Sequence, residues 1–396
     1  MISLDIKVET EKIVIDNKLK LSFKDPLVFY LLNKEALYLC SFVILDFQNE
    51  EIKYVETLSE ENKRKVEKEY GAGILMDPPH SIMGINKNKF LNMVYSVMSG
   101  VNNTFRIIDL EKNEMAIYTA EDFGYRGLGR VSETGTKDIE DKQVFYICFI
   151  KEDGSSTEYF KFSIDLQKSE HLFNDNGIFK NIPHQIARCG DFIFSSGFWE
   201  EEGKVLTYNI KNKKIDTIPL INPSHFEVLD NIVYYSSNNV KIENLAITFL
   251  GPARIGKIYI EGDKIRKGKE FSTPSGFRYT SHKCLSPEVL VTFGFPNRLI
   301  FINSESMELL FYYDVDEKIL PDTDVQDFLN NEYDRPGNDN CRYSALECSD
   351  DQKYVVFFNQ KVIRFFNFAD RKIEYEIKYK IKDLFFQFSH HCDLLR

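Results

Sequence analysis

Four short segments of the sequence carry a histidine just after a proline or serine and a few residues before an apolar stretch. They are IPHQIARCGDFIFSSG around His184, NPSHFEVLDNIVYYSS around His225, TSHKCLSPEVLVTFGF around His282 and QFSHHCDLLR around His390. Neutral histidine is the nitrogen ligand that transition metals prefer in proteins. If the four segments take the same place in a repeated fold, their imidazoles can converge on one metal ion.

The elements that must position these histidines are short β-strands. Most of the chain alternates apolar and polar residues with period two, broken by turns such as NKNK, KEDGSS, NIKNKK and EGDK. The strands come in groups of about four, which is the spacing of propeller blades. The predicted blades cover residues 26–57, 79–119, 128–168, 182–219, 223–273, 280–315 and 342–379, and the tail from Phe385 closes the first. The sequence therefore predicts an all-β fold, a seven-bladed β-propeller closed by the C-terminal strand, with residues 1–396 as a single domain.

Two helices are predicted as insertions between blades, at about residues 58–72 and 322–334. The first, SEENKRKVEKEY, follows Thr57, which forms a capping-box pattern with Glu60, and it should stop at Gly71. The second, DTDVQDFLNNEY, has Thr323 and Gln326 in the same relation. We expect both helices to pack over one face of the ring.

Composition and charge exclude several classes of function. The formal net charge is −11 and the basic residues are spread evenly, so the basic surface of a nucleic-acid-binding protein is missing. No stretch is long and apolar enough to span a bilayer, and contact with a membrane surface is possible but not indicated. The seven cysteines, an odd number without CxxC pairs, argue against a disulfide framework and for the reducing cytoplasm.

The alternative interpretation of the histidine segments is that each is a turn before a strand, with its histidine hydrogen-bonded or solvated. The sequence has seven histidines, and most of them fall at this place, which favours a shared role. His80 has the same opening with a longer gap and is left outside the metal set. His171 is expected on the surface in a connection, and His391 should point to the opposite strand face from His390. The predicted metal ligands are therefore His184, His225, His282 and His390.

With these histidines in place, the sequence resembles the carotenoid cleavage oxygenases, seven-bladed propellers that hold a non-haem Fe(II) with four histidines. That family places its last ligand almost at the C-terminus, and His390 lies six residues from the end of this chain. HFEVLDNIVYY at His225 is similar to the segment that opens with the family's second ligand. GPARIG and the basic stretch GDKIRKGKEF, which precede His282, are similar to the region ahead of the third. DPLVFYLLNKEALYLCSFVILDF resembles the early blade, with Asn33 and Lys34 where the family usually has an Asp-Gly turn.

The resemblance implies a dioxygenase that uses Fe(II) and dioxygen to cleave a conjugated carbon–carbon double bond. Its substrate would be an apolar carotenoid, apocarotenoid or stilbene-like molecule, and its products two carbonyl compounds. In that family, glutamates hydrogen-bond three of the ligand histidines and fix their tautomers. Glu152, in the segment IKEDG, is the candidate for the first of them, with a plain turn carboxylate as the alternative. The other two have no clear match, although Asp339 lies in the region of one.

Three other classes of function stay open. The histidines could hold Mn or another divalent ion and polarise a uronate carboxylate, as in the oligogalacturonate lyases. That reaction needs a cationic pocket, for which Arg130, Arg188, Lys283 and Arg342 are candidates, unless they are solvated turn charges. The chain could instead isomerise or only bind a polyene, or it could be a non-catalytic scaffold with incidental histidines.

Overall fold

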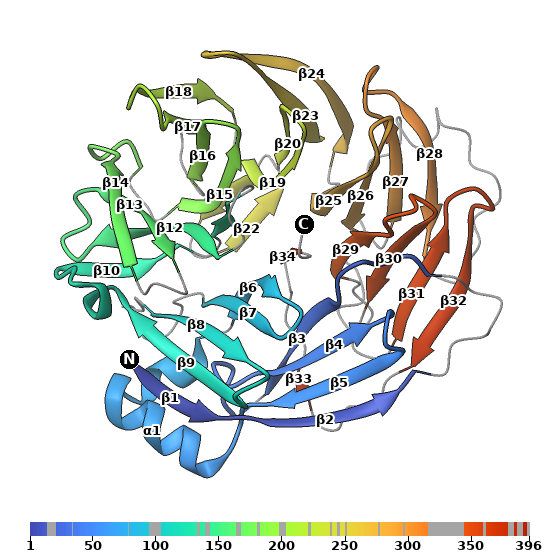
Figure 1. Cartoon of the computed structure of the whole chain (residues 1–396). Coiled ribbons are helices and arrows are strands. Elements are labelled where there is room, and N and C mark those ends of the chain that lie inside the picture. Colours follow the sequence, from blue (N-terminus) through green and yellow to red (C-terminus); the bar gives the residue numbers. More distant parts are fainter. Residues whose placement is uncertain are drawn as a thin grey trace. The chain divides into compact units, whose positions relative to one another are not determined.

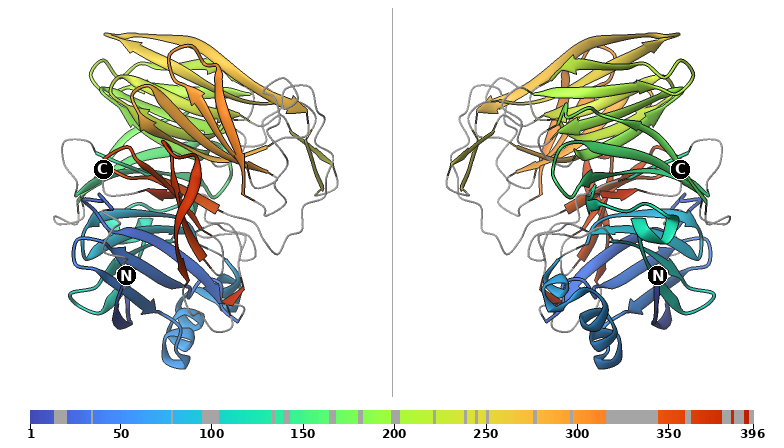
Figure 2. Two further views of the ribbon diagram at one scale, coloured as in Figure 1. Left: turned by 90° about the vertical axis from the view of Figure 1, so that its right-hand side faces the viewer. Right: turned by 90° about the vertical axis from the view of Figure 1, so that its left-hand side faces the viewer.

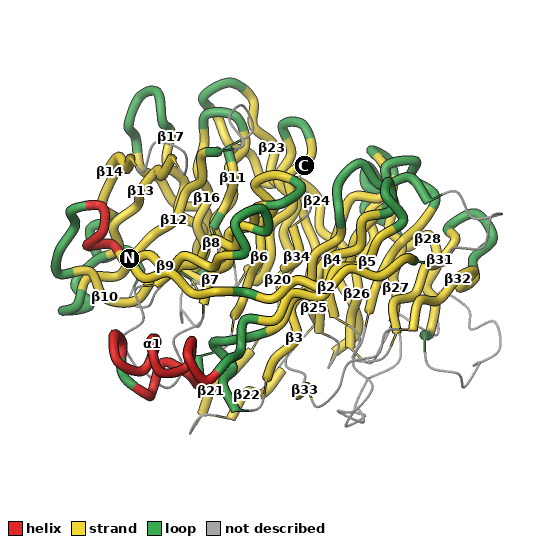
Figure 3. Tube along the Cα trace, turned by 60° about the horizontal axis from the view of Figure 1, so that its bottom comes forward, coloured by secondary structure: helices red, strands yellow, loops and turns green. Residues whose placement is uncertain are grey.

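The structure, a computed structural model, describes most of the chain and divides it into two compact units. The described residues are 1–13, 21–33, 35–77, 79–94, 104–132, 135–138, 143–163, 168–179, 183–197, 203–220, 223–237, 240–243, 246–249, 252–275, 278–295, 298–315, 344–358, 362–378, 384–385 and 391–393. One unit consists of Met1–Pro183 with Tyr379–Arg396, and the other of His184–Lys378. In the described residues the chain is almost entirely strand and tight loop (Figure 3).

The first unit contains three sheets, each a meander of antiparallel strands joined by short turns. Blade 1 is built from β3 (Leu27–Asn33), β4 (Ser41–Asp46), β5 (Glu51–Glu56) and β2 (Lys7–Lys12). Blade 2 is built from β6 (Pro79–Asn86), β7 (Lys89–Val94), β8 (Thr104–Asp109), β9 (Glu114–Thr119) and β1 (Ile2–Asp5). Blade 3 is built from β10 (Leu128–Val131), β11 (Thr136–Lys137), β12 (Val144–Lys151), β13 (Thr157–Ser163) and β14 (Lys168–Asn174).

The second unit contains four sheets of the same kind (Figure 1). Blade 4 is built from β15 (Pro183–Cys189), β16 (Phe192–Gly197), β17 (Lys204–Asn209) and β18 (Ile215–Pro219). Blade 5 is built from β19 (Pro223–Leu229), β20 (Ile232–Ser237), β23 (Pro252–Glu261) and β24 (Lys264–Ser275), with a hairpin of β21 (Val240–Glu243) and β22 (Ala246–Phe249) inserted. Blade 6 is built from β25 (Arg278–Ser286), β26 (Val289–Phe295), β27 (Arg298–Asn303) and β28 (Leu309–Asp314). Blade 7 is built from β29 (Ser344–Cys348), β30 (Tyr354–Phe358), β31 (Val362–Asn367) and β32 (Lys372–Lys378). The seven-bladed β-propeller predicted from the sequence is confirmed.

The core lies between the faces of neighbouring sheets, as expected when both faces of a strand carry apolar residues. Met83 and Phe105 of blade 2 pack against Phe145 and Phe162 of blade 3. The same arrangement recurs between blades 4 and 5, 5 and 6, and 6 and 7 of the second unit. Each fully buried Phe contributes about 1.5–3 kcal/mol relative to an exposed one. These four layers bury apolar side chains of both neighbouring sheets, which stabilises the packing of the blades within each unit.

Both ends of the chain add strands to blades 1 and 2. The N-terminal dozen residues supply β2 and β1, which pair with the last strands of blades 1 and 2. From the C-terminal tail, β33 (Leu384–Phe385) pairs antiparallel with β3, and β34 (His391–Asp393) pairs parallel with β6. The predicted attachment of Phe385 to the first blade is therefore observed, but the outer strand of that blade comes from the N-terminus.

The first predicted helix is present as α1 (Glu60–Tyr70) and lies beside β1 of the same unit (Figure 2). Its N-cap is Ser59, whose hydroxyl accepts from the Asn62 amide at 3.1 Å, so the predicted cap at Thr57 is wrong. Thr57 instead donates to the carbonyl of Cys40 at 2.8 Å. The helix ends at Gly71 as predicted, with φ of 84°. The second predicted helix, 322–334, lies outside the described residues.

Residues Lys168–Asn174 form the last strand of blade 3, so the prediction that His171 lies in a connection is wrong. Within the described part of the chain, no helix is long and apolar enough to cross a membrane.

Candidate functional site

Two of the predicted metal ligands, His225 and His282, are in edge-to-face contact in the second unit. His225 is the third residue of β19 and His282 the fifth of β25, the first strands of blades 5 and 6. Their side chains are buried, with 3% and 0% exposure. The ring centroids are 4.4 Å apart and the ring planes are nearly perpendicular, at 88°. The Nε2 of His225 lies 3.1 Å from the carbonyl oxygen of His282, to which it donates a hydrogen bond.

Strand alternation explains why these two rings meet. Leu229, four residues after His225 and on the same face of β19, packs against the core between blades 5 and 6. Cys284, two residues after His282 on β25, belongs to the same core. Both histidines therefore point into the layer between the two blades, where Tyr234 and other apolar side chains exclude water.

His282 is an unusual buried group. Neither of its ring nitrogens has a hydrogen-bond partner among the described residues. Burial lowers the pKa of His282 from 6.5 to about 3. The polar backbone of Tyr234 near the ring opposes this shift, and the positive charge of Lys283 adds to it. The ring is consequently neutral at pH 7, which is the form that binds metals.

A buried group of three charges adjoins the pair. The Nζ of Lys283 lies 3.3 Å from the carboxylate of Glu227 and 3.4 Å from that of Glu347. The three side chains are 10%, 12% and 7% exposed. They come from β19, β25 and β29, so these ion pairs connect the first strands of blades 5, 6 and 7.

The position of His184 in blade 4 differs from that of His225 in blade 5. Strands β15 and β19 each have seven residues, begin at a proline and end at a two-residue turn whose first residue has positive φ. Pro183 therefore corresponds to Pro223, and Gln185, which is buried, holds the position of His225. Counted from the turn that follows, His184 thus lies one residue earlier in β15 than His225 does in β19.

The structure brings together two of the four predicted ligands. The side chain of His184 and all of His390 lie outside the described residues, as do the side chains of His80 and His391. Within the described ranges, no group of three or more His, Cys, Asp or Glu residues is close enough to hold a metal. His282 fits a ligand role because of its unpartnered nitrogens. At His225 the Nε2 is engaged by a carbonyl, so coordination requires Nδ1 or a rotation of the ring.

Glu152, predicted to support a ligand histidine, is an exposed residue in the turn between β12 and β13. Its backbone N–H donates to the carbonyl of Gly127 at 3.1 Å. It belongs to the first unit, whereas His184 begins the second. This position matches the alternative interpretation of a turn carboxylate.

The structure describes some of the residues that were predicted for a cationic pocket. Arg188 donates to the carbonyl of Gly190 at 3.2 Å, and Lys283 belongs to the buried ion group. Arg130 is half-buried in β10, and Arg342 and Asp339 lie outside the described residues. Sequence reasoning missed Glu227, although its position two residues after His225 placed it on the same strand face.

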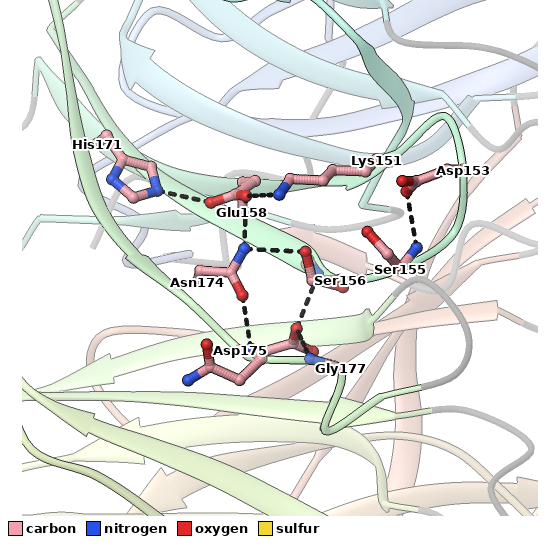
Figure 4. A network of polar contacts seen from close by, with 11 residues as sticks. Lys151, Asp153, Ser155, Ser156, Glu158, His171, Asn174, Asp175 and Gly177 are labelled. Carbon is pink, nitrogen blue, oxygen red and sulfur yellow. Dashed lines mark hydrogen bonds and ion pairs between the residues drawn. The ribbon is translucent and has the colours of Figure 1, made fainter.

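His171 belongs to a polar network on blade 3 (Figure 4). Its Nε2 lies 2.7 Å from Glu158, which also receives Lys151 at 3.0 Å and the side-chain amide of Asn174. Burial raises the pKa of Glu158, but the hydrogen bonds from Lys151, His171 and Asn174 outweigh it and hold that pKa below its usual value. His171 is 44% exposed, in line with its expected surface position.

No protein-family model matches the sequence, and no curated protein matches it significantly. Among solved structures, the chain is similar to Hsv2 of Kluyveromyces lactis, with 9% identity and a TM-score of 0.45. That similarity covers 77% of this chain and 84% of the other. At this identity and TM-score the similarity carries no argument.

Proposed function

We propose that the chain is a metal-dependent oxygenase whose Fe(II) is held by histidines that include His225 and His282. The observation that supports this is the buried, neutral imidazole of His282, with no hydrogen-bond partner for its nitrogens in the described part of the chain. Leaving a buried polar group unsatisfied costs about 1–3 kcal/mol. Coordination of a metal ion would offset that cost. His184 and His390 complete the proposed ligand set.

The proposed substrate is an apolar conjugated molecule, a carotenoid, apocarotenoid or stilbene, and dioxygen is the co-substrate. Bound Fe(II) would supply the redox chemistry that breaks the double bond. The protein's part is to hold the ring of His225 in one tautomer through the carbonyl of His282, and to keep water away through the apolar layer between blades 5 and 6. The substrate class rests on the resemblance of the sequence to the carotenoid cleavage oxygenases.

The lyase alternative has less support. It needs unpaired cationic charge for a uronate, and Lys283 already faces two carboxylates. We keep the reducing cytoplasm as the proposed location. Supporting this, the five cysteines whose side chains are described are buried and form no disulfide: Cys40, Cys148, Cys189, Cys284 and Cys348.

The metal is tested by elemental analysis of protein purified without chelator. We expect about one iron per chain in the wild type, and none in His225→Ala or His282→Ala. His171→Ala is the matched control, since this histidine lies on the surface of blade 3, and it should keep its iron. Manganese in place of iron would favour a lyase, and a wild type free of any transition metal would leave the scaffold interpretation.

The reaction is tested by oxygen consumption with an apocarotenoid or a stilbene. An oxygenase consumes dioxygen and forms carbonyl products, and the activity disappears with His282→Ala. A lyase would instead raise the ultraviolet absorbance of an oligogalacturonate solution without oxygen. Iron in the protein without oxygen consumption on either substrate would contradict the proposed substrate class.

A further inference from the structure

We propose that Lys283 is a positioning residue for the histidine pair. Through its ion pairs with Glu227 and Glu347, it would hold the first strands of blades 5, 6 and 7 in the register that brings His225 and His282 into contact. This inference rests on the proposed function, because it concerns the same two histidines.

The positions of the charges along the strands carry the inference. Lys283 directly follows His282, and Glu227 is two residues from His225 on the same strand face. Each histidine thus lies within two residues of a charge anchored on a neighbouring strand. Glu347, on β29, holds the lysine from the third strand at 3.4 Å. A slide of β25 along β19 would have to break these contacts.

The contact between the histidines depends on the same register. His225 donates to the backbone carbonyl of His282 itself, at 3.1 Å. That bond is made only if β25 keeps its place relative to β19, since a displacement of one residue would present a different carbonyl. The ion pairs and this hydrogen bond therefore report on one geometric quantity, the alignment of the two strands.

The burial of the three charges indicates that they fix the alignment of the strands and do not mainly stabilise the fold. Charges at 7–12% exposure lose most of their hydration, and buried ion pairs can often be replaced by apolar residues without loss of stability. What such a group does supply is direction, because a lysine between two carboxylates has few acceptable positions. We therefore expect Lys283 to affect the relative positions of His225 and His282.

The second unit provides a matched control in Lys257. This lysine is also buried, at 3%, and its Nζ donates to the backbone carbonyls of Ser304 at 2.7 Å and Glu305 at 3.0 Å. Its two hydrogen bonds go to backbone carbonyls, and no ion pair joins it to a carboxylate within the described part of the chain. Lys283→Met and Lys257→Met thus make the same chemical change at two buried positions.

The experiment measures Co(II) affinity by absorption spectroscopy and determines crystal structures of the metal-free proteins. Groups that orient metal ligands typically contribute about 10–100-fold to affinity, so Lys283→Met should weaken Co(II) binding by at least about tenfold. Its structure should lack the hydrogen bond between His225 and the carbonyl of His282. Lys257→Met should bind Co(II) as the wild type does. A triple variant, Glu227→Gln, Lys283→Met and Glu347→Gln, removes all three charges of the group together and should show the same weakening if the single variant fails to fold.

The outcomes separate this inference from the proposed function. Wild-type affinity in both Lys283→Met and the triple variant would overturn the positioning role while leaving the metal site standing. If the wild type binds no Co(II), the metal site is refuted. The crystal structures then decide alone whether Lys283 positions the two histidines. An unchanged histidine pair in the triple variant would then overturn the inference as well.

Discussion

Replacing Gly256 by alanine should destabilise blade 5 through a clash that can be located to a few atoms. Gly256 lies on β23, paired with Tyr235 of β20 on one side and Glu270 of β24 on the other. A Cβ at this position would lie 2.6 Å from both the Cζ and the hydroxyl oxygen of Tyr235, and 2.8 Å from the Cγ of Glu270. Such distances are too short for carbon contacts, so the Tyr235 ring must move.

The cost follows from what holds that ring. Tyr235 is fully buried between blades 4 and 5, and its hydroxyl donates to the carboxylate of Glu270. Overpacking of a core typically costs about 1–3 kcal/mol. Losing a hydrogen bond to a charged group costs about 1.5–3 kcal/mol. Since the ring can relieve the clash only at the expense of that bond, we expect Gly256→Ala to lower the free energy of unfolding by about 3 kcal/mol.

A double-mutant cycle in urea denaturation tests this reasoning. Tyr235→Leu removes the ring atoms that the new Cβ would meet, so Gly256→Ala should cost much less in the Tyr235→Leu background than in the wild type. Gly129→Ala is a control, because its nearest contacts, at 3.4–3.6 Å, are ordinary. Equal costs for Gly256→Ala in the two backgrounds would refute the clash as the cause.

Three further predictions concern other parts of the chain. Leu4 of β1 is fully buried, so Leu4→Ala should lower the free energy of unfolding in urea by about 3 kcal/mol; a cost under about 1 kcal/mol would show that β1 is dispensable. In chelator-treated protein the pKa of His282 is about 3, below the 6.5 of the same imidazole in the unfolded chain. As the pH falls, the unfolded chain therefore binds the proton before the folded protein does. Between about pH 7.5 and 5 this histidine should remove about 2 kcal/mol of stability, and His282→Gln should flatten that slope in urea titrations, while an unaltered slope would contradict the buried neutral ring. Ser59→Ala should cost about 1 kcal/mol in thermal unfolding because Ser59 caps α1, and an unchanged melting temperature would argue against the cap.

The blades were predictable because their signal is local. Strands such as β12 and β20 combine apolar runs with turns of Gly, Asn and Asp, and both the pattern and the turn are visible within ten residues. Predicted blade limits such as 79–119 and 223–273 agree with β6–β9 and β19–β24 to within two residues. Short-range chemistry is sufficient for a meander, since each strand pairs with the next one in the sequence.

The places of strands that lack an apolar face were not predicted from the local pattern. The last strand of blade 3, KSEHLFN, is largely exposed, and β2, KVETEK, even more so. Their places are decided by pairing with distant or already formed strands, which no local pattern encodes. The same holds for the helix cap: Thr57 matches the capping-box pattern with Glu60, but its hydroxyl donates to the carbonyl of Cys40, and Ser59 accepts from Asn62 instead.

The histidine segments illustrate a different limit. A motif such as proline or serine followed by histidine was aligned by residue type, but the position in a strand is measured from the turn. Measured in that way, the proline of β15 matches the proline of β19, and Gln185 takes the place of His225. Two similar strings can thus place their histidines at different distances from the turn that follows.

The string GPARIG was one part of the family resemblance, and the structure gives its described residues reasons that do not involve a metal. Gly256 makes room for Tyr235, Ala253 packs in the core between blades 5 and 6, and Arg254 lies 3.6 Å from Glu270. Each of these contacts would be needed in a blade of this shape whatever the protein does. The string therefore argues for the architecture of blade 5, and the case for chemistry rests on His282. Its buried ring has no structural reason of that kind among the described residues, and neither the core nor the strand pairing requires an imidazole there.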